Sequence, residues 1–208
     1  VFEGNPPTAK RITGVLADIT GRRRQEEALR RAAEMDAFRV GLADALRPLA
    51  DPLLIQQTAL QFAAGQLNLD RLLYNEIDAD VTTYTTRACY VREGFTAYGG
   101  AHPMGPFTES VRALQEGITK VVYDVQADES FSPEEKRICA SIQVGAFVTV
   151  PLLKAGRWVL NLVAHSSKPR PWSPQEISLL EETAERTWAA VERAQAEEAL
   201  RESEAKYR

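Results

Sequence analysis

The chain has 208 residues, of which 44% are hydrophobic and 26% charged, and its formal net charge is −4. This composition supports one full domain with connecting segments and excludes a disordered chain. No segment gathers enough lysine and arginine for nucleic-acid binding, and the longest apolar stretch, 144–153, is too short to cross a membrane. With two separated cysteines and no export signal, we expect a cytoplasmic chain without direct membrane contact, which leaves a membrane-anchored parent protein open.

The N-terminal part of the chain predicts one short strand followed by two helices. Apolar residues among small and polar neighbours indicate an isolated strand over 10–20. Apolar residues at three- and four-residue steps then predict a helix over 21–47. Asp51 as N-cap and Pro52 at the first helical position predict a second helix that runs towards Asn68.

The middle of the chain predicts an antiparallel sheet. Alternating β-branched and aromatic residues indicate strands over 69–77 and 82–92, joined by a polar turn. The glycine-rich stretch 94–105 is interpreted as a loop, which is a common place for ligand contacts, and a helix over 108–115 follows it. Three further strands are predicted over 120–125, 146–153 and 157–165.

Two helices in the second half begin with the same Ser-Pro signature. Ser132 is followed by Pro133 and two glutamates, and Ser173 is followed by Pro174 and a Gln-Glu pair. A serine N-cap, a proline at the first helical position and nearby carboxylates are typical of a helix start. We expect the first helix to end near Gly145 and the second to continue to the end of the chain.

One five-residue sequence occurs twice, once on each side of the globular part. Glu-Glu-Ala-Leu-Arg occupies residues 26–30 and again residues 197–201. A helix that is charged on most faces and has a narrow apolar seam is not stable alone and commonly pairs as a coiled coil. We therefore expect a homodimer formed through the terminal helices.

Several motifs follow one another in a fixed order. The run Val-Gly-Ala-Phe-Val-Thr-Val-Pro-Leu occupies 144–152, Gly156 marks the next turn, and Arg-Pro-Trp-Ser-Pro-Gln-Glu occupies 170–176. The stretch 122–128, which contains Val-Tyr-Asp-Val and a second aspartate, precedes them. Together these motifs resemble GAF domains of bacterial sensor histidine kinases, and the resemblance covers about 35–193.

The resemblance implies an α+β, GAF-like fold. Its central six-stranded antiparallel sheet would carry the N- and C-terminal helices on one face, and short helices and loops would form a pocket on the other. The stretch 14–20 is similar to the last strand of PAS domains. We therefore expect a PAS strand remnant over 1–20, a connecting signalling helix over 21–34, a GAF domain over 35–193, and an exit signalling helix over 194–208 that leads to a further domain.

The same resemblance implies a small-molecule pocket, whereas a filled core without a ligand is the alternative. The pocket would draw residues from the sheet, from the glycine-rich loop and its following helix, from the end of the short strand at 120–125, and from the Ser132 helix. The candidate pocket residues are Tyr74, Tyr98, Phe107, Asp124, Arg137, Cys139, Ser141 and Thr149.

The sequence argues against the cofactors that its cysteines and histidines first suggest. Photoreceptor GAF domains attach bilins through a cysteine usually paired with a histidine, and Cys139 is followed by alanine. His102 and His165 are isolated from other metal ligands, which favours structural roles over haem or metal binding. Asp124 and Asp128 are interpreted as turn-forming carboxylates. We expect neither bilin nor haem, no metal and no catalytic residue, and the cofactor stays unknown.

The sequence thus predicts a regulatory sensory and dimerisation module of a bacterial signal-transduction protein of the sensor histidine kinase type. A small-molecule ligand is its candidate partner, and coiled-coil helices would relay its state to adjacent PAS and output domains. No kinase motif is present, so the fragment itself is not expected to be an enzyme. Two alternatives remain: a cysteine-based reductase of GAF fold, which requires an exposed cysteine of lowered pKa, and a passive dimerisation spacer.

Overall fold

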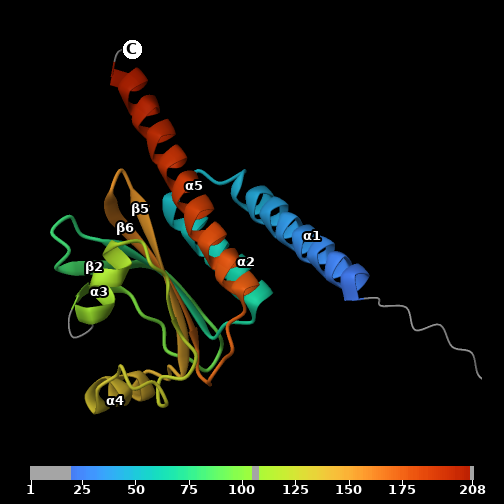
Figure 1. The fold of residues 1–208 in the computed structure, drawn as a ribbon. Helices are drawn as coiled ribbons and strands as arrows, with labels where there is room; N and C mark the ends of the chain where they lie inside the picture. The colour runs from blue at the N-terminus through green and yellow to red at the C-terminus, as the bar shows by residue number, and fades with distance from the viewer. Residues whose placement is uncertain (1–19, 105–107, 207–208) are drawn as a thin grey trace, which may run out of the picture.

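The computed structural model describes residues 20–104 and 108–206, which form a six-stranded antiparallel sheet with helices on both sides (Figure 1). This architecture confirms the predicted fold class. Every neighbouring pair of strands is antiparallel, and the two strands nearest the chain ends in sequence, β1 and β6, lie together at the centre. The strand order across the sheet is β3 (Gly100–Pro103), β2 (Thr83–Val91), β1 (Arg71–Ile77), β6 (Arg157–Ser166), β5 (Ala146–Lys154) and β4 (Lys120–Val122).

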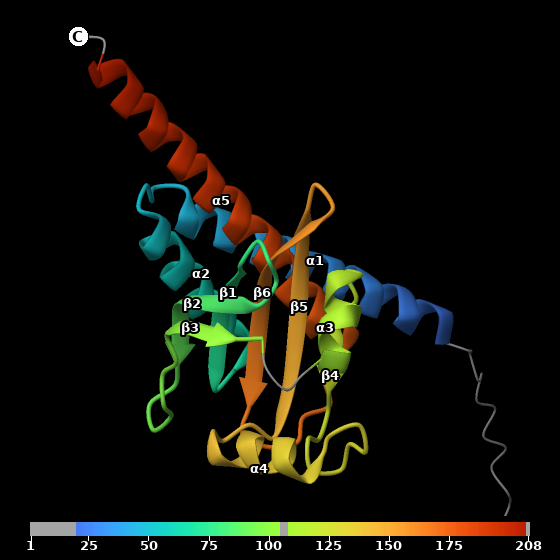
Figure 2. The ribbon, with the colours of Figure 1, turned by 90° about the vertical axis from the view of Figure 1, so that its left-hand side faces the viewer.

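Three helices cover one face of the sheet and two shorter ones lie elsewhere (Figure 2). The covering helices are α1 (Thr20–Leu46), α2 (Pro52–Leu67) and α5 (Pro174–Lys206); α2 packs on β1 and β2, α5 packs on β5 and β6, and α1 packs on α2 and α5. The shorter α3 (Thr108–Gln115) lies over β4, β5 and β6 on the opposite side, and α4 (Pro133–Ser141) lies at one end of the sheet. No helix of the described residues combines the length and apolar character that a membrane span requires.

Local sequence signals explain where the helices begin and end. The Asp51 carboxylate accepts a hydrogen bond from the backbone N–H of Leu54 at 2.9 Å, and Asn68 ends α2 in the left-handed conformation with φ 51°. At α4, Ser132 and Glu135 exchange side-chain and backbone hydrogen bonds in a capping box. These contacts satisfy backbone groups that a helix end would otherwise leave without partners.

Three boundaries differ from the sequence-based expectation. The predicted loop over 94–105 contains strand β3, which pairs with β2 from Thr83 to Thr86. A four-residue edge strand with glycine at one end and proline at the other has too little alternation to be detected. Strand β4 ends at Val122 instead of Val125, and α4 ends before Gly145. The predicted PAS strand over 10–20 lies outside the described residues, apart from its last residue, which begins α1.

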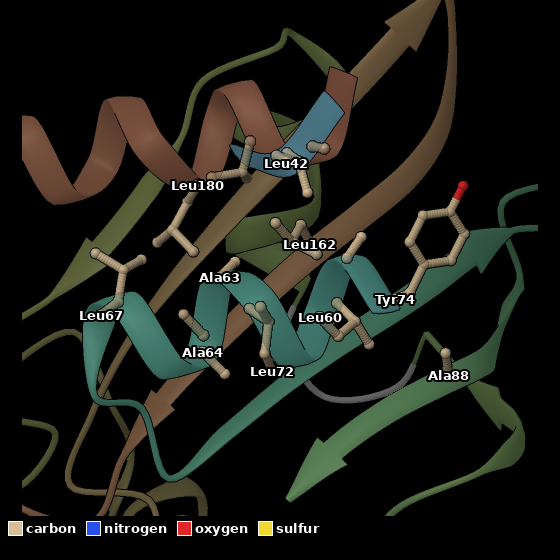
Figure 3. Close-up of a cluster of buried hydrophobic side chains, with 14 of the residues drawn as sticks. Leu42, Leu60, Ala63, Ala64, Leu67, Leu72, Tyr74, Ala88, Leu162 and Leu180 are labelled. Atoms are coloured by element: carbon tan, nitrogen blue, oxygen red, sulfur yellow. The ribbon is translucent and has the colours of Figure 1, made fainter. Parts of the chain in front are cut away.

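The two faces of the central strands contact different parts of the molecule. Leu72 and Tyr74 of β1 and Leu162 of β6 face the helix layer (Figure 3). There they belong to one buried cluster with Leu60 of α2 and Leu180 of α5. Their neighbours along each strand point to the opposite face, because successive side chains of a strand alternate. The helix layer and the opposite layer are therefore separated by a single sheet.

Helices α1 and α5 contact each other and run in the same direction. Gln175 donates to Glu34 at 3.0 Å, and Arg39 donates to Glu182 at 3.2 Å. Beyond this contact the two helices extend past opposite ends of the domain (Figure 1). The two Glu-Glu-Ala-Leu-Arg copies therefore lie far apart in one chain, and their leucines, Leu29 and Leu200, are 71% and 60% exposed.

Candidate functional site

A cavity of about 290 Å³ lies on the sheet face opposite α2 and α5. Four strands supply its floor, and residues of the β2–β3 loop, β3, α3 and the end of α4 complete its walls. A wider hollow of about 420 Å³ lies between α1 and the start of α5, but it is an open surface groove and few residues line it. The enclosed cavity is the better candidate because ligand sites bury most of their ligand.

A row of polar side chains crosses the floor of this cavity. Thr86 of β2 lies opposite Asn75 of β1, and Asn75 lies opposite Asn161 of β6. The Thr86 hydroxyl donates to Asn75 Oδ1 at 2.8 Å, and Trp158 Nε1 donates to Asn161 Oδ1 at 2.8 Å. All three polar residues are buried. Buried carboxamides fixed by protein partners in this way can select ligand groups by hydrogen bonding.

Aromatic rings form the sides of the cavity. Tyr84 and His102 stack with centroids 5.3 Å apart and an interplanar angle of 30°. Phe147 meets His165 edge-on at 6.4 Å. Apolar side chains such as Leu73 fill the space between them. Such walls favour a flat, largely apolar ligand.

A buried cation lies behind the cavity wall at the end near α4, where it contacts lining residues. Arg71, which is 1% exposed, donates from Nη2 to the Ile142 carbonyl at 2.5 Å, and its Nη1 lies 3.4 Å from His165 Nδ1. Its guanidinium carbon lies 5.0 Å from the ring centroid of Tyr98 and 5.8 Å from that of Phe95. These cation–π contacts hold the guanidinium between the sheet and the glycine-rich loop.

His165 is neutral in this environment. Burial, together with the neighbouring Arg71 charge, lowers its pKa from 6.5 to about 3. A neutral imidazole can accept a hydrogen bond from the guanidinium through an unprotonated Nδ1, which lies 3.4 Å from Arg71 Nη1. Arg71 is therefore the charged member of this pair.

The structure places three of the eight predicted residues in the cavity wall: Tyr98, Cys139 and Thr149. Tyr74 is a correction, because it lies on the opposite face of the sheet in the core under α2 (Figure 3). Its sequence neighbours Leu73 and Asn75 line the cavity instead. The prediction was wrong by one residue along β1. A shift of one residue along a strand moves a side chain from one face of the sheet to the other.

Three more predicted residues do not line the cavity. The Asp124 carboxylate accepts hydrogen bonds from the backbone N–H groups of Gln126 and Ala127, so it forms a turn, as interpreted from the sequence. Arg137 and Ser141 are exposed on α4, where each donates its side-chain hydrogen bond to a carbonyl of the helix itself. Cys139 occupies the inward side of that helix, so its outer positions cannot reach the ligand. The eighth residue, Phe107, lies outside the described residues.

Sequence reasoning missed most of the polar wall. Thr149 could have led to part of it, since Thr149 pairs with Val163, and two-residue steps along β6 then reach Asn161 and His165. That pairing register is not readable from the sequence alone. The missed polar residues are Asn75, Thr86, His102, Lys120, Asn161 and His165.

Neither cysteine resembles a reactive thiol. Burial raises the pKa of Cys89 and of Cys139 above the ordinary value. A cysteine-based reductase needs the opposite shift, because the thiolate is the nucleophile. Within the described residues, no group of three or more histidine, cysteine, aspartate or glutamate side chains is placed to hold a metal ion.

A central antiparallel sheet with helices on one face and a ligand-sized cavity on the other defines an α+β domain that can hold a small molecule. The GAF domain family model matches residues 51–191, and the chain belongs to that family. No curated protein matches the chain.

Solved structures of photoreceptor GAF domains share the fold. The far-red absorbing dark state of JSC1_58120g3 with bound biliverdin IXa is 16% identical, covers 76% of this chain and 99% of its own, and has a TM-score of 0.66. The blue-light absorbing form of the Thermosynechococcus elongatus PixJ GAF domain is 22% identical, with coverages of 76% and 95% and a TM-score of 0.64. The chromophore-binding domain of bacteriophytochrome RpBphP3 from R. palustris is 16% identical, with coverages of 78% and 63% and a TM-score of 0.66.

These structures correct the expectation that set a bilin aside. One of them holds biliverdin IXa in a GAF fold that superposes on three quarters of this chain. The argument against a bilin relied on the residue next to Cys139. A neighbouring residue in sequence is a poor guide, since the cavity wall is assembled from strands and helices far apart in the chain.

Proposed function

We propose that this chain is a non-enzymatic sensory module of a bacterial signalling protein, in which a planar ligand in the cavity sets the packing of α1 and α5. The observation that supports this proposal is that neighbouring residues of a central strand face opposite sides of the sheet. Thr149 lines the cavity, whereas Val148 and Val150 on either side of it belong to the core under the helices. Because protein cores are close-packed, a ligand that shifts the strand also changes the surface that supports the helix layer.

The helix layer offers a route from the sheet to the neighbouring modules. Helix α2 contacts β1 and β2 on one side and α5 on the other, and α1 contacts both α2 and α5. The exposed repeats at 26–30 and 197–201 are suited to pair with a second chain in a parallel coiled coil. A ligand would bias this bundle only by binding one packing more tightly than the other. Adjacent PAS and histidine-kinase output domains of the parent protein would receive the change.

A linear tetrapyrrole is the first ligand class to test, because structures of the same fold are bilin photoreceptors. The residues fit its chemistry in part: Cys139 places a thiol in the wall, and Tyr98, His102 and Phe147 offer flat ring contacts. A bound bilin would supply absorption of visible light. The enclosed volume is at the low end of the roughly 300–1,000 Å³ typical of ligand sites, so part of a tetrapyrrole would extend beyond it.

Native mass spectrometry of the purified chain, with and without added biliverdin, tests the proposal. We expect a bound small molecule, together with a rise in melting temperature once its concentration exceeds its dissociation constant. If biliverdin is the ligand, a covalent adduct lost in Cys139→Ser but kept in Cys89→Ser would identify the attachment thiol. A chain that gains neither mass nor thermal stability with biliverdin or with any member of a cofactor library would contradict ligand sensing.

Sedimentation tests the relay separately. We expect a dimer for the 208-residue chain and a weaker dimer for a Leu29→Glu, Leu200→Glu double variant, since both leucines are exposed in the single chain. A monomer at high concentration would remove the dimeric relay, whatever the cavity binds.

A further inference from the structure

We infer that the cavity selects an anionic ligand rich in hydrogen-bond acceptors, in the simplest case a planar aromatic carboxylate. This inference rests on the proposed function, because it specifies the chemistry of the ligand bound in the same cavity. Three observations carry it: the orientation of two buried carboxamides, the charge balance around the cavity, and the flat walls.

The two carboxamides on the floor present donors to the ligand. Trp158 Nε1 can only donate, so its 2.8 Å contact fixes the oxygen of Asn161 towards the tryptophan. Asn75 likewise uses its oxygen to accept from Thr86. In the part of the chain that the structure describes, neither Nδ2 group donates a hydrogen bond to protein. Both side chains line the cavity and are over nine-tenths buried, so a ligand oxygen is the partner that would satisfy them.

The described side chains that line the cavity include no aspartate or glutamate. Lys120 is in the wall and interacts electrostatically with Asp128 and Glu135, so the charge argument depends on Arg71. Arg71 forms no ion pair among the described residues, and its buried Nε–H has no hydrogen-bond partner. Its neighbours are a carbonyl, two aromatic rings and a neutral imidazole. A buried cation without a counter-ion is costly, so an anion bound beside it gains a charge-assisted interaction.

The shape of the cavity walls narrows the class of ligand further. The Tyr84–His102 stack and the Phe147 ring border the same space as the two amides. Aromatic faces and edges in the walls favour a flat conjugated group that lies against them. Arg71 contacts three wall residues, Tyr98, Ile142 and His165, so the anionic end of the ligand would lie at that end of the cavity.

Matched probes that differ only in charge test this inference on the whole chain. We would measure the affinity at pH 7 for 2-naphthoate against 2-naphthamide and for benzoate against benzamide, by calorimetry. Each carboxylate should bind about tenfold or more tightly than its amide, as expected for a hydrogen bond to a charged group. Arg71→Met should remove that preference, whereas Arg137→Gln, on the exposed side of α4, should keep it.

A second variant covers the risk that Arg71→Met does not fold. Asn161→Asp keeps an oxygen for Trp158 and nearly the same volume, but it places a negative charge on the floor and should also abolish the carboxylate preference. Equal binding of carboxylates and amides by the unmodified chain would overturn the inference and leave a sensory cavity for neutral ligands. If no probe binds and no small molecule co-purifies, both this inference and the proposed ligand-sensing function are contradicted.

Discussion

Arg39 of α1 and Glu182 of α5 form an ion pair at 3.2 Å that joins positions 143 residues apart. Glu182 also accepts from Arg186 one turn further along α5. Burial alone would raise the pKa of Glu182, but the hydrogen bonds from Arg186 and Arg39 lower it below the ordinary value. The carboxylate therefore stays charged and fixes where the first helix meets the last.

Loss of this pair should loosen the first helix without unfolding the domain. Arg39→Met keeps the length of the side chain but removes its charge, so amides in 36–46 should exchange faster with deuterated solvent while those of the sheet stay protected. Arg47→Met is the matched control, because Arg47 directly follows α1 and forms its ion pair with Asp44 of the same helix. Equal protection of 36–46 in both variants would show that apolar packing alone holds α1 on α5.

Gly145 is a position where any side chain should be costly. A Cβ there would lie 2.6 Å from the carbonyl oxygen of Ser167, and this backbone cannot move cheaply because Gly145 N–H donates to Ser166 O. Gly145→Ala should therefore reduce the free energy of unfolding by about 1–3 kcal/mol in urea titrations. Gly65→Ala, in α2 with open space around the new methyl, should instead stabilise the chain by about 0.5–1 kcal/mol. If Gly145→Ala were more stable than Gly65→Ala, the close approach of Gly145 to the Ser167 carbonyl would be contradicted.

His165 should make the domain sensitive to acid. Its pKa is about 3 in the folded chain and near 6.5 in the unfolded chain, so the unfolded state binds the extra proton between these values. Stability should then fall as pH drops from about 6.5 towards 3, by at most about 1.4 kcal/mol per pH unit from this group. His165→Gln should flatten the slope of unfolding free energy against pH in that window. An unchanged slope in His165→Gln would show that the imidazole titrates normally.

The two thiols should be slow to react in the folded chain. Burial raises the pKa of Cys139, so at pH 7.5 a disulfide reagent should modify it at least about tenfold more slowly than in urea. The Cys89→Ser variant isolates this rate. Rapid modification of the folded chain would show that Cys139 is accessible and reactive, as the reductase alternative requires.

Sequence reasoning succeeded where the signal is local. The Ser132 and Asp51 caps and the turn at Asp124 each depend on residues within three positions, and the structure contains all three. The six-stranded sheet was implied by the family resemblance, while the residues alone indicated five of its strands. The missing strand, β3, can be recognised only from its pairing with β2.

The cavity was only partly predictable because burial does not alternate along β1. Leu72, Leu73 and Tyr74 are all buried, since this central strand is covered on both faces. Nothing in such a run distinguishes the helix side from the ligand side, so Tyr74 was assigned to the wrong one. Asn75 and Asn161 become neighbours only through the register of β1 and β6, which links positions far apart in sequence.

Helix α5 runs for 33 residues with proline only at its first position and no glycine, and its last buried residue is Ala194. At 1.5 Å per residue it is a rod roughly 50 Å long, of which about the last 18 Å stands clear of the domain. Sharp kinks in helices occur mostly at proline or glycine, and the interior of α5 contains neither. In the proposed relay, a roll or tilt at the base of the rod would therefore change the orientation of its tip.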